Sequence, residues 1–119
     1  MIKLLEAEDK ISTLKEFGSN VSYIGFNFND PLLKDPFFRK ALALAIDRQS
    51  LIDYFLNDRT RIANQILSPE HWASEKINTT EYNPNLAKDY IKEIGIIEPI
   101  VITLKTSTDP FRVKIATVI

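Results

Sequence analysis

The sequence predicts an α/β fold of mixed strands and helices, in one domain of 119 residues. Two short segments, residues 23–28 and 100–104, have the residue types and the spacing of strands. Three helical patterns begin with an aspartate or asparagine followed by proline, which is a helix-start signal. Because strand and helix patterns alternate along the chain, an α/β arrangement is favoured over an all-α bundle.

The composition excludes several classes of function. The formal net charge of -1 provides no basic excess for nucleic acid or an anionic membrane surface, so we expect no nucleic-acid partner. The absence of cysteine rules out disulfides, thiolate metal sites and a thiol nucleophile. Apolar runs are too short to span a membrane, and acidic residues follow Lys3 too soon for an apolar signal segment.

The first helical pattern lies within residues 1–20. We interpret residues 2–17 as an amphipathic surface helix of uncertain origin that ends at Gly18. Its apolar positions, at near-helical spacing among charges, are Leu4, Leu5, Ile11 and Leu14.

Residues 23–48 organise the rest of the chain. In the strand pattern of residues 23–28, bulky apolar side chains alternate with Tyr23, Gly25 and Asn27. Asp35 and Pro36 then predict a helix start, and Asp47 predicts the start of a second helix. The expected apolar positions are Phe38, Ala41, Leu42 and Ala45 in the first helix, and Leu51, Ile52, Tyr54 and Phe55 in the second.

Residues 57–84 lack periodicity and predict a long irregular stretch, with a turn of helix near residues 69–74. A helix capped by Asn83 follows, and Gly95 supplies its left-handed end. After the strand pattern of residues 100–104, Asp109 and Pro110 predict a last helix, for which no stop signal is present. We therefore expect the chain to be a fragment of a larger protein.

These segments also carry a resemblance to a known family. An aromatic-rich strand ending in Phe-Asn and a proline-containing loop precede the motif formed by Asp35, Arg39, Ala41, Ala45, Ile46, Asp47 and Arg48. A second motif is formed by Tyr82, Pro84, Ala87 and Gly95, with Ile91 where leucine is usual. Taken in order, the motifs resemble the family 5 extracellular solute-binding proteins, the substrate-binding components of bacterial oligopeptide, dipeptide and nickel importers. The resemblance covers roughly residues 21–119.

The resemblance implies a partial C-terminal lobe of a periplasmic-binding-protein type II fold, with residues 1–20 unassigned. It implies a two-lobed parent in the periplasm or cell envelope that closes over a peptide or similar small solute and serves the membrane permease of an ABC importer. The alternative is a stand-alone remnant that acts inside the cell as a small self-associating or interaction protein.

By resemblance, the loop after residues 100–104 approaches the ligand cleft. The candidate ligand-binding residues are therefore Thr106, Ser107, Thr108, Asp109 and Arg112, whose hydroxyls, carboxylate and guanidinium can meet a peptide's backbone and termini. Helix capping explains Asp109 equally well. We assign Arg39, Asp47 and Arg48 structural roles, as a cap or as partners of carboxylates or carbonyls. The alternative is that one of the three faces the ligand cleft.

We find no catalytic constellation and expect neither enzymatic activity nor a cofactor. His71 is the sole histidine, and without a second histidine or any cysteine it cannot build a usual zinc site, so we expect no metal. We interpret His71 as a surface residue beside a partly buried Trp72. Phosphate-binding glycine motifs and a nucleophile elbow are absent from the sequence.

Overall fold

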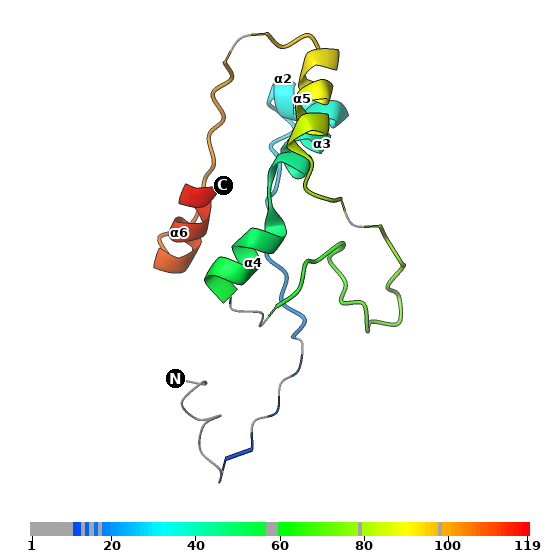
Figure 1. Cartoon of the computed structure of the whole chain (residues 1–119), viewed down its shortest axis with the longest axis vertical. Helices are drawn as coiled ribbons and strands as arrows, with labels where there is room; N and C mark the ends of the chain where they lie inside the picture. Colours follow the sequence, from blue (N-terminus) through cyan, green and yellow to red (C-terminus); the bar gives the residue numbers. More distant parts are fainter. Residues whose placement is uncertain are drawn as a thin grey trace.

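The computed structural model describes residues 11, 12, 14, 16, 18–56, 60–78, 80–97 and 99–119. The predicted helix over residues 2–17 therefore falls largely outside the described residues. Five helices lie within the described part of the chain (Figure 1). They are α2 (Pro31–Lys34), α3 (Pro36–Ala45), α4 (Arg48–Leu56), α5 (Pro84–Glu93) and α6 (Pro110–Val118).

Four of these helices begin with the same pair of residues, an acid or amide at the cap and proline at the first helical position. The three predicted pairs are confirmed: Asp35 precedes α3, Asn83 precedes α5 and Asp109 precedes α6. In each pair the side-chain oxygen accepts from main-chain N–H groups of the first turn, which otherwise lack partners in a helix. Asp30 repeats the arrangement at the single turn of α2, which the sequence pattern did not reveal.

The start of α4 and the end of α5 also agree with prediction. Asp47 accepts from the main-chain nitrogen of Ser50 at 3.0 Å and from its hydroxyl at 2.7 Å. Gly95 has a φ of 74°, a left-handed value that glycine adopts without a steric penalty.

The core of the described region lies between α3 and α5, which run side by side in Figure 1. Ala41 and Leu44 of α3 pack with Ala87 of α5, and the ring of Tyr90 lies 5.6 Å from that of Phe37. The small alanine side chains let the two helices approach closely. A main-chain bond from the Asn83 nitrogen to the Leu44 oxygen, 2.9 Å long, joins the end of α3 to the start of α5.

The buried face of α3 differs from the expected one. Phe38 and Ala41 are buried as predicted, but Leu44 is buried in place of Ala45, which is exposed, and Leu42 is half-buried. Every position after Lys40 in this helix is apolar, so the sequence pattern does not select one face. The position of α5 decides which side chains are covered.

The two predicted strands are not observed. Residues 23–27 and 100–104 lie in no helix or strand, and Phe28 begins a turn. They form no ladder with another described segment, and the described elements are helical. Tyr23 is 82% exposed and Val101 is 93% exposed. The residue types favour strands, but a strand forms only when a neighbouring edge supplies hydrogen bonds. The α/β class is therefore not confirmed for this chain.

Candidate functional site

The predicted ligand-binding residues lie on an exposed segment that leads into α6. Thr106, Ser107, Thr108, Asp109 and Arg112 are all exposed. The Asp109 carboxylate accepts from the Arg112 main-chain nitrogen at 2.9 Å, and the Ser107 hydroxyl accepts from the Asp109 nitrogen at 3.4 Å. These bonds join Ser107, Asp109 and Arg112 in one capped turn. Asp109 therefore caps α6, as one of the two explanations predicted. Its role in binding a ligand stays a prediction.

Arg39 and Arg48 serve structural roles, as predicted. The Arg39 guanidinium donates to the carbonyl oxygens of Leu33 at 2.9 Å and Lys34 at 2.7 Å, and lies 4.6 Å from the centre of the Phe28 ring. It therefore closes the end of α2, whose last carbonyls lack partners within the helix. Arg48 donates to the carbonyl oxygen of Thr80 and so ties the irregular stretch to the start of α4.

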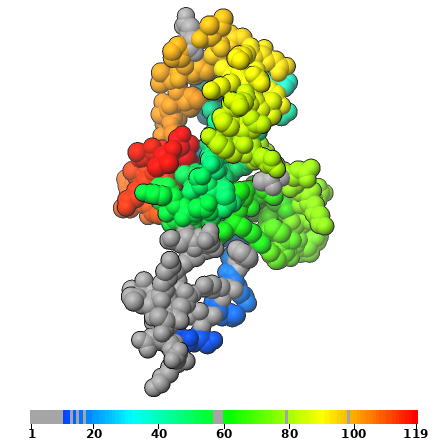
Figure 2. All heavy atoms as spheres, in the orientation of Figure 1, coloured from blue at the N-terminus to red at the C-terminus, as the bar shows by residue number. Residues whose placement is uncertain are grey.

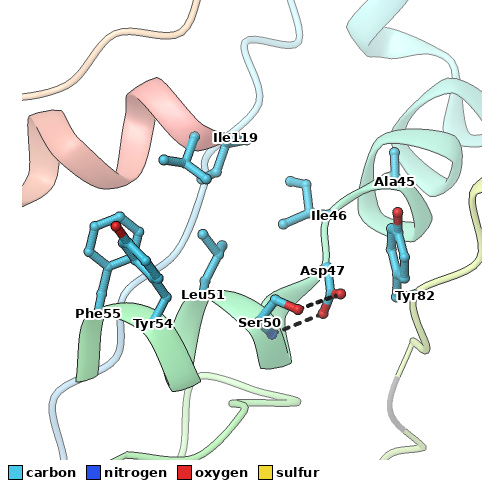
Figure 3. A pocket seen from close by; sticks show the side chains of 10 residues that line it. Ala45, Ile46, Asp47, Ser50, Leu51, Tyr54, Phe55, Tyr82 and Ile119 are labelled. Carbon is cyan, nitrogen blue, oxygen red and sulfur yellow. Dashed lines mark hydrogen bonds between the residues drawn. The ribbon is translucent and has the colours of Figure 1, made fainter. Parts of the chain in front are cut away.

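A depression of about 430 Å³, which sequence reasoning did not find, lies between α4, the end of α3 and the end of α6 (Figure 3). Leu51, Tyr54 and Phe55 of α4 face Ile119 across it. Ala45, Ile46, Asp47, Ser50, Tyr82 and Val118 complete its lining. The Phe55 ring also meets that of Phe111 edge-on at 6.2 Å, which joins α4 to α6.

This depression can receive apolar groups, because most of its lining side chains are apolar or aromatic. Its charged group, Asp47, is already engaged by Ser50, which lowers the pKa of the Asp47 carboxyl. The lining residues come from distant parts of the sequence, for example Asp47, Tyr82 and Ile119. No short-range spacing could therefore have revealed the depression.

The irregular stretch contains a loop, residues 60–78, that is closed by its own polar side chains. Arg61 and Glu70 form an ion pair of 2.5 Å. The hydrogen bond from Arg61, together with one from the Ser68 hydroxyl, lowers the pKa of Glu70 to about 2. Gln65 donates to the Glu75 carbonyl oxygen at 3.0 Å and to Ser74, so it links the two sides of the loop.

The tip of this loop corrects two expectations. Residues 68–74 form two successive tight turns, with N–H to carbonyl bonds from His71 to Ser68 and from Ser74 to His71, rather than a turn of helix. Trp72 is 91% exposed, not partly buried as expected. His71 is a surface residue as predicted, and its ring stacks on that of Trp72 at 5.6 Å.

The described residues contain neither a metal-binding cluster nor a membrane-spanning helix. No group of three or more His, Cys, Asp or Glu side chains in that part of the chain is arranged to hold a metal ion. None of the described helices has both the length and the apolar character needed to cross a membrane.

Comparisons with known proteins match the chain over most of its length. The peptide transport periplasmic protein SapA of Haemophilus influenzae is 32% identical over 101 residues, 81% of this chain and 18% of the relative. The probable ABC transporter periplasmic-binding protein SapA of Escherichia coli is 32% identical over 96 residues, 80% of this chain and 18% of the relative. Di/tripeptide-binding protein 1 of Pseudomonas aeruginosa is 27% identical over 101 residues, 84% of this chain and 19% of the relative.

The chain thus spans less than a fifth of the length of these relatives. No solved structure matches it. The family model described as "Bacterial extracellular solute-binding proteins, family 5 Middle" matches residues 1–119. This match agrees with the motifs around Asp35 and Asn83, and the chain belongs to the family 5 bacterial extracellular solute-binding proteins.

Proposed function

We propose that this chain is part of the C-terminal lobe of the substrate-binding component of an ABC importer, and that the whole protein binds peptides between two lobes. The observation that carries the proposal is the family match over residues 1–119. The printed names of the three relatives support it, since they describe peptide transport, an ABC transporter and the binding of di- and tripeptides. These names favour a transport role over a free-standing interaction protein.

The unpaired extended segments support the same proposal. Residues 23–28 and 100–104 carry strand-type side chains, yet the described chain offers them no ladder partner. In an α/β lobe of type II topology, the remaining chain would supply the neighbouring strands and cover the exposed apolar side chains. The same additional structure would make the fold α/β, as the sequence predicts.

The loop before α6 is our candidate for direct contact with peptide. Thr106, Ser107 and Thr108 offer hydroxyl groups that can donate to and accept from a peptide backbone. Asp109 can pair with an amino terminus and Arg112 with a carboxylate, the latter through two parallel hydrogen bonds. Because these side chains are exposed on one short turn, a ligand can reach them without rearrangement of α6.

The mechanism that follows is closure of two lobes by hinge motion. Peptide bound to the loop of one lobe adds contacts with the second lobe only in the closed state, so it shifts the population towards closure. The closed protein would then deliver the peptide to the importer's membrane permease. We place the whole protein in the periplasm or cell envelope, in keeping with the periplasmic relatives.

The test is calorimetry on the full-length protein with Ala-Ala, tri-alanine and penta-alanine as probes. We expect binding of at least one probe at micromolar concentration or below. The isolated chain should bind it weakly or not at all, since it spans so small a share of its relatives. If a spectrum shows that the full-length protein is folded and it binds none of the probes, that result would count against peptide as the ligand class.

Two variants separate ligand contact from capping at Asp109. Asparagine is as good a cap as aspartate, so Asp109→Asn keeps the start of α6 and removes only the negative charge. If Asp109 pairs with a peptide amino group, peptide affinity should fall about tenfold, which is the lower range for losing a charged hydrogen bond. Arg112→Gln should weaken binding similarly, whereas Lys114→Gln, an exposed charge change in the same helix, should not. Unchanged affinity in both site variants would remove the loop from the binding site.

A further inference from the structure

The two motifs that carry the family resemblance meet each other in the fold. The loop that follows α4 projects on the side of the molecule away from α6 (Figure 2), and the chain then returns to the junction of α3 and α4 at Thr80. The Thr80 carbonyl oxygen accepts from the Arg48 guanidinium, and the Asn83 main-chain nitrogen donates to the Leu44 carbonyl oxygen at 2.9 Å. Residues 80–83, which we call the strap, are therefore bonded to one residue on each side of the junction.

Helix packing alone does not fix the direction of α4 relative to α3. In the described chain, the helix pairs in broad contact are α3 with α5 and α2 with α3. At Ile46, between α3 and α4, the backbone is extended with a ψ of 115°, and Asp47 then caps α4. Tyr82 of the strap lies beside Ala45 and Asp47 at this junction (Figure 3). The strap thus supplies the contacts across the junction that the two helices do not make themselves.

The direction of α4 matters for the candidate ligand residues because α4 packs on the start of α6. The rings of Phe55 and Phe111 meet edge-on at 6.2 Å. Phe111 lies in the first turn of α6, between Asp109 and Arg112, the two charged candidates. A change in the direction of α4 would displace this ring contact and, with it, the turn that presents Asp109 and Arg112.

We propose that Arg48 is a positioning residue for peptide binding: it holds the strap against the start of α4 and so, through Phe55 and Phe111, orients the turn of the candidate ligand residues. The inference rests on the proposed function. It assigns Arg48 to the fold rather than to the ligand cleft, because its guanidinium is used by the Thr80 carbonyl oxygen. Arginine suits this role, since it stays charged and a charged donor makes a stronger hydrogen bond than a neutral one.

The experiment measures spin-label distances and the affinity for alanine peptides in the full-length protein. Labels at Lys40→Cys and Asp53→Cys report the placement of α4 relative to α3, and labels at Lys40→Cys and Asn85→Cys report that of α5 relative to α3. We expect Arg48→Gln to broaden or shift the first distance distribution and to leave the second unchanged. Its affinity for Ala-Ala, tri-alanine or penta-alanine should fall about threefold, within the range for residues coupled to a site that they do not touch.

Three further variants separate positioning from ligand contact. Arg48→Lys keeps a cationic donor for the Thr80 carbonyl oxygen, so it should restore most of the wild-type distances and affinity. Phe55→Leu removes the ring contact with Phe111, and combined with Arg48→Gln it should lower the affinity no more than the larger single change does, because both act along one path. Lys88→Gln, the matched loss of an exposed positive charge on α5, should change neither quantity.

Loss of peptide affinity in Arg48→Gln without a change in the distance between α3 and α4 would place Arg48 at the ligand and overturn the proposal. A changed distance with unchanged affinity would make the strap a support of the fold alone, and would overturn it as well. The proposed function fails separately, if the wild-type protein binds none of the alanine peptides. The distance measurement needs no ligand, so it tests the strap in that case too.

Discussion

Replacement of Leu44 by alanine tests the observed packing of α3 against α5. Leu44 is 8% exposed and packs with Ala41 and Ala87, so the change removes three carbon atoms from a nearly closed site. At about 0.8 kcal/mol for each buried methylene, the transfer cost is about 2 kcal/mol, and the cavity left behind raises the total to about 2–4 kcal/mol. The same replacement at Leu86 of α5, which is 40% exposed, should cost about 1 kcal/mol because part of that side chain already contacts water.

Amide hydrogen exchange of α3 and α5 in the full-length protein measures this difference. Where exchange reports the equilibrium between closed and open forms, Leu44→Ala should speed it about 30-fold or more, and Leu86→Ala about tenfold or less. Equal acceleration by the two variants would refute the assignment of Leu44 to the core. A larger effect from Leu86 would mean that α5 presents a different face to α3.

Three further predictions concern a cap, a glycine and an ion pair. Asp35→Ala removes a side chain that accepts from two main-chain N–H groups of α3. The free energy of unfolding, measured in urea, should therefore fall by about 1 kcal/mol, whereas Asp35→Asn should keep most of that stability because asparagine also caps a helix. Gly95→Ala should cost about 1 kcal/mol in the same assay because its φ is 74°, even though open space surrounds the added carbon. Gly25→Ala should cost less, since the added carbon there makes only an ordinary van der Waals contact. The Glu70 carboxyl should titrate near pH 2 when followed by its NMR carbon shift. Because the folded pKa is lowered from 4.5, the stabilisation of the loop should be complete above about pH 4.5 and be lost as pH falls towards 2; an unshifted titration, or no change in Arg61→Gln, would contradict the ion pair.

The helix starts were predictable because each is encoded by neighbouring residues. The pairs Asp35-Pro36, Asn83-Pro84 and Asp109-Pro110 bring the capping oxygen and the fixed φ of proline to the first turn, whatever the rest of the chain does. The single turn of α2 was missed because four residues are too few to show a helical period. Gly95 was predictable for a similar local reason.

The features that depend on distant residues were not predictable. The choice of Leu44 over Ala45 as a core residue is made by α5, which begins nearly forty positions later. The extended segments have strand-type residues, but their pairing depends on edges that the described chain does not provide. A large aromatic side chain such as Trp72 is usually at least half-buried, and its observed exposure has no signal in composition.

The candidate ligand residues remain a prediction from the family resemblance, since their observed contacts are those of a capped turn. The depression beside α4 shows why spacing alone could not reveal a site here. Asp47, Tyr82 and Ile119 lie more than thirty positions apart in sequence and meet only in the folded chain.

The paired caps and prolines have a consequence for the order of folding. Each helix start needs contacts within about three residues, so it can form as soon as its own segment is free. Residues 23–28 and 100–104 can form strands only after a strand from a distant part of the chain lies beside them, which costs more chain entropy. In this region the individual helix starts should therefore form early. The packing of α3 against α5 should follow later, because it must first close the nearly forty positions of chain between them.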